Sequence, residues 1–172
     1  MLFLKESTGL TAALVDLAAP WSKLYAHSKA VSAATSFLHI APLIFGAGAA
    51  FVMDRVTLRV SRAGAQERSA HLRELAGTHR VVLTGLALSA LSGVLLFLSD
   101  VETFLASPLF WIKLVLVGVL LVNGALMVQT ERSLARAGVT DALWGRLRLL
   151  SMLSAVLWLA TTLAGVVLRE FA

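Results

Sequence analysis

Cysteine is absent from this chain of 172 residues. Its absence excludes a disulfide, a thiolate metal site and a cysteine nucleophile. The motifs of soluble enzymes are missing too, because the sequence contains no P-loop, GxGxxG, HExxH or Gly-x-Ser-x-Gly. Its carboxylates are scattered, and the sequence predicts no pair of them inside an apolar segment. These absences favour a protein that is not an enzyme, although they leave enzyme activity open.

Charged residues are nearly missing from four long runs, which cover Ala30–Met53, Val81–Ser99, Leu114–Thr130 and Leu149–Leu168. A helix needs roughly 20 apolar residues to cross a bilayer core about 30 Å thick, and lipid offers no partner to other backbone conformations. Hydrophobic residues make up 58% of the chain, above the ~45–50% of ordinary soluble domains. The sequence therefore predicts an all-α integral membrane protein, a four-transmembrane-helix up-down bundle.

The residues before the first run have the pattern of an amphipathic helix. Apolar side chains recur three, four and seven positions apart at Leu10, Leu14, Leu17, Trp21 and Leu24, which places them on one helix face. We predict an N-terminal interfacial amphipathic helix over residues 1–29, kinked near Pro20, ahead of a transmembrane domain over residues 30–172. An unstructured tail is the alternative. The predicted spans are residues 30–57, 79–99, 108–130 and 148–168.

Lysine and arginine are distributed unevenly between the connectors. Ten arginines lie within residues 55–80 and 132–148, whereas the other side carries four cations, Lys5, Lys23, Lys29 and Arg169. Cations accumulate on the cytoplasmic side of membrane proteins. We therefore predict cytoplasmic arginine-rich connectors, both termini outside, and a bacterial inner membrane as the location. Within the connectors we predict turns around Gly64, Gly77 and Gly138.

Small residues recur in the first two runs. Gly85, Ser89 and Gly93 follow one another every four residues, and residues 46–50 are all glycine or alanine. Small side chains let helix backbones approach closely in lipid, where no hydrophobic effect drives helices together. The pattern predicts close contact between the first and second spans.

His39 and Lys113 lie at similar depth in the first and third runs. Ionisable groups inside a membrane are expensive and mark functional sites. The two side chains form a candidate cofactor-binding pocket for an anionic headgroup, a quinone carbonyl or a haem with one histidine ligand. In the alternative, Lys113 extends to the headgroups and His39 bonds a backbone carbonyl.

The other histidines argue against two haems. A bis-histidine haem needs two histidines at matching depth on different helices. His27 precedes the first run, His71 falls in a connector, and His79 lies at the opposite end from His39. A two-haem cytochrome is therefore not predicted, and a single haem b stays open.

Three methionines and one histidine fall at the cytoplasmic end of the predicted bundle. Met53, Met127, Met152 and His79 offer thioether and imidazole ligands that suit Cu(I) if all of them point inward. The alternative is that the methionines fill gaps in the core.

Two further polar residues are expected to join helices. Asp54 closes the first run, and we predict an ion pair with Arg80 or His79. Asn123 lies deep in the third run, where its amide needs an interhelical partner. The candidate partners at compatible depth are Thr161, Thr162, Ser89 and Ser92.

Part of the chain resembles known bacterial membrane families. The first stretch is Phe37-Leu38-His39-Ile40 with Gly46, Gly48 and Asp54-Arg55, and the second runs from Leu91-Ser92-Gly93-Val94-Leu95-Leu96-Phe97 through Pro108-Leu109-Phe110-Trp111-Ile112-Lys113 to Asn123-Gly124. This part of the chain is similar to small uncharacterised four-helix membrane proteins related to the copper-resistance D-type membrane domain. The resemblance implies a four-helix bundle in which the first-span histidine, here His39, matters.

These observations predict a small non-catalytic integral membrane protein, a subunit or accessory component of a larger membrane assembly. The alternative is a haem- or copper-binding redox or copper-handling protein that uses His39 or the set of three methionines and His79. A transporter fits less well, because four spans without broken helices are few for a monomer. The expected partners are membrane lipids and protein subunits or further copies of the chain, and not nucleic acid.

Overall fold

The described part of the chain folds into six helices. The computed structural model describes residues 2–61, 63–137 and 140–171, and within these ranges it has no strand. The helices are α1 (Leu2–His27), α2 (Lys29–Val60), α3 (Ala65–Ser99), α4 (Val101–Ala106), α5 (Pro108–Ala137) and α6 (Asp141–Phe171). Four of them, α2, α3, α5 and α6, are long and apolar enough to cross a membrane.

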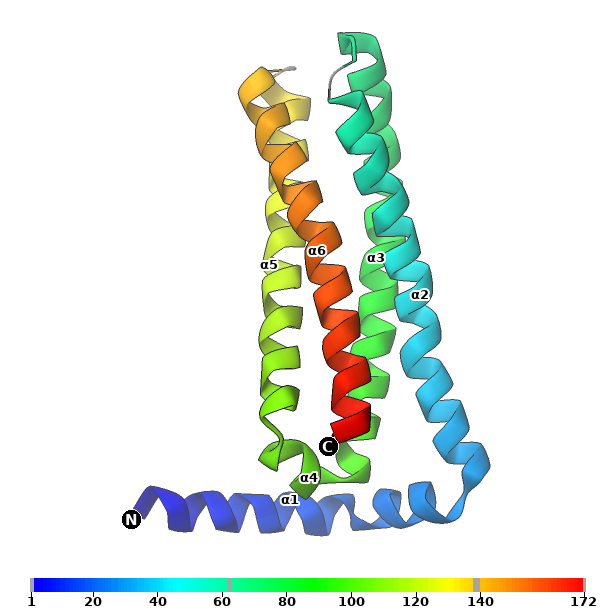
Figure 1. The fold of residues 1–172 in the computed structure, drawn as a ribbon, viewed down its shortest axis with the longest axis vertical. Coiled ribbons are helices and arrows are strands. Elements are labelled where there is room, and N and C mark those ends of the chain that lie inside the picture. Colours follow the sequence, from blue (N-terminus) through cyan, green and yellow to red (C-terminus); the bar gives the residue numbers. More distant parts are fainter. Residues whose placement is uncertain (1, 62, 138–139, 172) are drawn as a thin grey trace.

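The four long helices run side by side, and α1 crosses one end of them (Figure 1). We call this end, where α4 and the C-terminus also lie, the α1 end, and the opposite end the far end. The α2–α3 and α5–α6 connections both lie at the far end. Contacts are most extensive within the pairs α2–α3 and α5–α6, and α6 also packs on α2. By contrast, α3 and α5 barely touch each other.

Local sequence signals account for the helix boundaries at the α1 end. Ser28 separates α1 from α2, and its side chain accepts a hydrogen bond from the amide of Val31 at 3.3 Å. Asp100 likewise caps α4 by accepting from the amide of Thr103 at 3.2 Å. Pro108 is the first residue of α5, a position where the missing amide hydrogen costs nothing.

The helices continue further at the far end than the sequence suggests. Gly64 stands between α2 and α3 as predicted, but the predicted turn around Gly77 is wrong, because α3 passes through it. Leu75 packs against Trp144 and Leu147 in an apolar cluster, and this contact holds the segment in the helix despite its arginines. The predicted turn at Gly138 lies outside the described residues.

The predicted close contact between the first two spans is confirmed. A Cβ atom on Gly85 would lie 2.6 Å from the carbonyl oxygen of Pro42 and 3.4 Å from the Cα atom of Gly46. Such distances leave room for hydrogen only, so the backbones of α2 and α3 meet here.

Two side chains of α1 attach it to the end of α3. The indole nitrogen of Trp21 donates a hydrogen bond to the carbonyl of Leu95 at 2.7 Å, and the hydroxyl of Ser22 donates to the carbonyl of Ser99 at 2.8 Å. Leu10 and Leu17 remain exposed. The helix is therefore fixed to the bundle at its C-terminal half.

Candidate functional site

The side chain of His39 binds α2 to α3. Its Nδ1 atom lies 2.9 Å from the carbonyl oxygen of Ser89 and 3.3 Å from the hydroxyl of Ser92. The Ser89 hydroxyl donates to the carbonyl of His39 at 3.2 Å, and that of Ser92 donates to the carbonyl of Leu38 at 3.2 Å. The backbone-carbonyl bond considered for His39 is therefore present.

Lys113 lies beside α6. Its Nζ atom lies 3.4 Å from the point where Gly165 would carry a Cβ atom. The predicted pocket between His39 and Lys113 stays a prediction, with Nδ1 of His39 held by Ser89.

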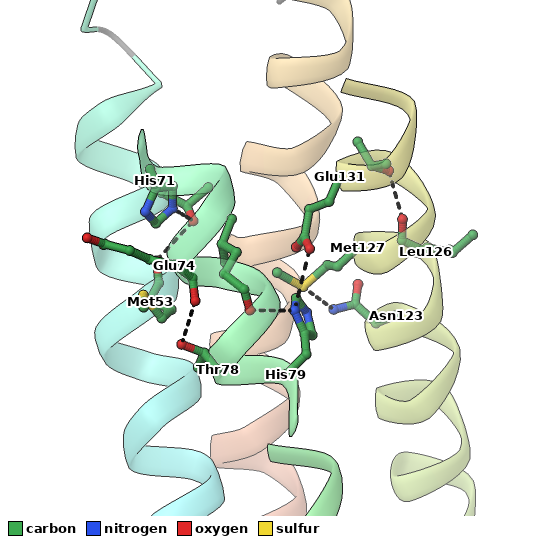
Figure 2. A network of polar contacts seen from close by, with 12 residues as sticks. Met53, His71, Glu74, Thr78, His79, Asn123, Leu126, Met127 and Glu131 are labelled. Atoms are coloured by element: carbon green, nitrogen blue, oxygen red, sulfur yellow. Dashed lines mark hydrogen bonds and ion pairs between the residues drawn. The ribbon is translucent and has the colours of Figure 1, made fainter. Parts of the chain in front are cut away.

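A second polar cluster lies toward the far end and contains two carboxylates. Asp54 on α2 and Glu131 on α5 are buried, with 3% and 9% of their surfaces exposed. The Nδ1 atom of His79 lies 3.4 Å from Glu131 Oε2 and 2.9 Å from the carbonyl oxygen of Leu75 (Figure 2). The sequence placed Glu131 outside the predicted spans, whereas the structure buries it on α5.

The predicted ion pair of Asp54 with Arg80 or His79 is wrong. Within the described residues the ion pairs are Arg68–Asp141, at 2.9 Å, and His79–Glu131. Arg80 is exposed. Asp54 instead lies beside the hydroxyls of Ser151 and Ser154 on α6, because α2 packs on α6 at this level.

Asn123 makes the expected interhelical hydrogen bond with an unexpected partner. Its amide nitrogen donates to the backbone carbonyl of Leu150 on α6 at 3.1 Å, and it lies 3.8 Å from the sulfur of Met127. None of the four side chains considered as partners takes this role in the described structure. A backbone carbonyl has no sequence signature, so the residue types did not reveal it.

Three oxygen atoms of this cluster have no hydrogen-bond partner among the described residues. They are Asp54 Oδ2, Asn123 Oδ1 and Glu131 Oε1. All three are acceptors of hydrogen bonds. A buried polar atom without a partner costs about 1–3 kcal/mol, and more when the group is charged. These three oxygens remain without a partner even though the hydroxyls of Ser151 and Ser154 lie beside Asp54.

A cavity of about 610 Å³ lies beside these atoms, where α3 and α5 stand apart. Asp54 and Asn123 line it, together with apolar side chains that include Leu83 and Leu121. Exposed Arg132 and the neighbouring Arg136 lie where it approaches the far end. A volume of this size fits a small organic molecule or part of a lipid.

The four predicted copper ligands are not all brought together. Met53, Met127 and His79 line the cavity, and in Figure 2 Met53 lies on the α2 side and Met127 on the α5 side. Met152 is 42% exposed and is not among the residues that line the cavity. Within the described part of the chain, no group of three or more histidine, cysteine, aspartate or glutamate residues is placed to hold a metal ion.

Two polar residues of this region were missed as site residues. His71, predicted in a connector, lies buried on α3, where its Nε2 atom is 2.7 Å from the hydroxyl of Thr57. Glu131 lies four residues after Met127 and eight after Asn123, and this spacing places all three on one helix face. Extending the third predicted span by one turn would have identified Glu131.

Comparisons with protein-family models, with curated proteins and with solved structures give no match to this chain. The resemblance to the copper-resistance D-type membrane domain therefore stays a prediction. The cavity and the side chains around it are therefore the basis of the proposed function.

Proposed function

We propose that this chain is a small non-catalytic integral membrane protein that acts as an accessory component of a larger membrane assembly. Its working site is the cavity between α3 and α5, where it binds a membrane constituent. The observation that carries the proposal is the set of unpartnered, buried acceptors beside an open cavity. A ligand with hydrogen-bond donors removes the cost of burying them.

The membrane placement in this proposal is an up-down bundle of α2, α3, α5 and α6, with the far end cytoplasmic. The supporting facts are the length and apolarity of the four helices and the arginines near their far ends. Both termini then lie outside, and α1 lies along the outer surface as an amphipathic helix. The exposed Leu10 and Leu17 provide apolar side chains for that contact.

The gap between α3 and α5 supports a binding role. Helices in lipid associate through close packing, and the sparse contact between these two leaves their facing surfaces uncovered. Apolar side chains predominate in the lining of the cavity. Such a lining suits non-covalent binding of an amphiphile that enters from the bilayer.

Two glycines of α5 give a matched test. Neither Gly124, which lines the cavity, nor the exposed Gly118, which does not, has an atom within 4 Å of an added Cβ. We expect Gly124→Leu to fill the cavity and Gly118→Leu to leave it open. Native mass spectrometry in mild detergent should show lipid retained by the wild type and by Gly118→Leu, and lost from Gly124→Leu. Equal retention by both variants would contradict the proposed site.

The assembly part of the proposal has its own measurement. Purification in mild detergent with a tag on the chain, followed by quantitative mass spectrometry, should give at least one other membrane protein at fixed stoichiometry. A pure chain of a single copy, with no stoichiometric partner, would overturn the assembly role while leaving the cavity proposal to the glycine test.

A copper-handling function is the second candidate, because Met53, Met127 and His79 all line the cavity. The His79 Nδ1 atom is held by the Leu75 carbonyl, which leaves Nε2 available to a metal, as in many metal-binding histidines. Anaerobic titration with Cu(I) and metal analysis should then show copper lost in Met127→Leu and kept in the exposed-site control Met152→Leu. An ultraviolet–visible spectrum of the same sample tests a haem at His39.

A further inference from the structure

The chemistry of the unpartnered atoms restricts what the cavity can hold. Asp54 Oδ2 and Asn123 Oδ1 belong to side chains that are each 3% exposed and that line the cavity. Both oxygens are acceptors of hydrogen bonds. The complementary group is a cation with several N–H donors, and a primary ammonium offers three of them.

Toward the far end, the side chains that line the cavity are positively charged. Arg132 and Arg136 line the cavity, and both are exposed. A guanidinium pairs with phosphate through parallel charge-assisted hydrogen bonds. The lining therefore carries acceptors deep inside and cationic donors toward its exposed end. A ligand that matches both has an ammonium and a phosphate within one small group.

The apolar side chains of the lining suit the part of the ligand that is not the headgroup. Leu83 on α3 and Leu121 on α5 line the cavity and are 56% and 47% exposed. They lie where the two helices stand apart, so an acyl chain can lie against them and continue into the surrounding lipid. The far end is also the end that the proposed orientation assigns to the cytoplasmic leaflet.

We infer that the cavity binds the headgroup of an aminophospholipid, of which phosphatidylethanolamine is the simplest. The ammonium lies against Asp54 and Asn123, the phosphate pairs with Arg132 and Arg136, and an acyl chain lies along the wall between α3 and α5. This inference rests on the proposed function and names the ligand of its site.

Other membrane constituents fit the same lining less well. A choline headgroup has no N–H donor for Asp54 and Asn123, and a glycerol headgroup has no cation for the carboxylates. A bare metal ion leaves most of a 610 Å³ cavity empty. The comparison between lipids of identical acyl chains therefore isolates the headgroup.

The decisive experiment measures lipid preference in the wild-type protein. Delipidated protein is incubated with equimolar phosphatidylethanolamine, phosphatidylcholine and phosphatidylglycerol of the same acyl chains, and bound lipid is counted by native mass spectrometry. We expect about ten-fold enrichment of phosphatidylethanolamine, the ratio that corresponds to losing one charge-assisted hydrogen bond. Equal binding of the three lipids, or preference for either of the others, overturns the inference.

Two substitutions test which residues bind the ammonium and which bind the phosphate of the headgroup. Asp54→Asn keeps the shape of the side chain and should abolish the preference over phosphatidylcholine, and Arg132→Gln should weaken binding of all three lipids. The control is Arg55→Gln, an exposed arginine next to Asp54 in the sequence that is outside the lining. Loss of preference in Arg55→Gln as well would show a general effect of charge and contradict the site.

The outcomes for the ligand and for the site are separable. If Gly124→Leu removes bound lipid but the wild type shows no headgroup preference, the cavity binds lipid and the aminophospholipid inference fails. If the wild type binds no lipid above the level of Gly124→Leu, the proposed site fails as well. The wild-type comparison requires no variant, so a misfolded substitution cannot decide it.

Discussion

The two polar clusters of this bundle differ in how their hydrogen bonds are completed. Near the α1 end, His39 bonds to Ser89, and the hydroxyls of Ser89 and Ser92 reach carbonyls of α2. Toward the far end, Asp54 and Asn123 each keep an oxygen without a partner in the described structure. The first cluster holds two helices together, and the second has acceptors that its own chain does not satisfy.

Helix spacing explains this difference. Where Gly46 and Gly85 allow backbone contact, α2 and α3 are close enough for short side chains to reach carbonyls across the interface. Where α3 and α5 stand apart, Asp54 Oδ2, Asn123 Oδ1 and Glu131 Oε1 have no hydrogen-bond partner among the described residues. Polar residues inside a membrane bundle are thus structural where helices touch and available for a ligand where they separate.

The largest expected effect is on the closely packed side. Gly85→Ala places a methyl group 2.6 Å from the backbone oxygen of Pro42, so α2 and α3 must move apart. We expect a loss of about 2–3 kcal/mol in unfolding free energy, at the upper end of overpacking effects. Thermal unfolding in detergent, followed by circular dichroism, measures it. Gly118→Ala, with open space around the new methyl, should change little.

The second-largest loss of stability is expected from removing His39, the histidine of the first cluster. His39→Ala deletes the bond to Ser89 and leaves that carbonyl with the Ser92 hydroxyl as its side-chain donor. We expect a loss of about 1–2 kcal/mol, measured by the same unfolding experiment. The control is His27→Ala, because exposed His27 bonds within its own helix to Lys23. An equal loss in both variants would contradict a special role for the α2–α3 link.

In the second cluster, the one that contains Asp54 and Asn123, a substitution should increase the unfolding free energy instead of lowering it. In delipidated protein, Asp54→Asn removes a buried charge that has an unpartnered oxygen and sits near Glu131. We expect a gain of about 1 kcal/mol in stability, because an uncompensated buried charge is costly. Destabilisation as large as that of His39→Ala would show that Asp54 is as well satisfied as the first cluster.

The smallest effect is expected at the exposed ion pair between α3 and α6. Asp141 is 92% exposed where it accepts from Arg68, and such pairs contribute little. Asp141→Asn should change unfolding free energy by less than about 0.5 kcal/mol. Arg68→Met should cost more, because Arg68 also donates to the Ser61 carbonyl and lies 5.4 Å from the centre of the Trp144 ring.

The helices and their closest contact follow from local sequence signals. Uncharged runs predict the four long apolar helices, Pro108 marks the start of α5, and small residues predict the contact at Gly46 and Gly85. These signals work because each depends on a few consecutive residues. Gly77 was misassigned because the contacts that keep α3 helical beside it, such as Leu75 with Trp144, come from a distant part of the chain.

The candidate site was only partly predictable for the same reason. His39, Lys113, Met127 and His79 stand out by residue type and depth, and the structure places Met127 and His79 in the lining of one cavity. The position of Asp54 beside the serines of α6 depends on the packing of α2 on α6. The separation of α3 from α5, which makes the cavity, leaves no mark in either sequence segment.

The attachment of α1 has a consequence for the order in which the molecule is assembled. Trp21 and Ser22 bond to carbonyls that follow them by 74 and 77 residues. During synthesis, α1 leaves the ribosome before α3, and its docking site exists only after α3 has been made and inserted. Until then the helix has to be held by lipid alone, for which its leucine face is suited. Of these two helices, the one made earlier thus reaches its final position later.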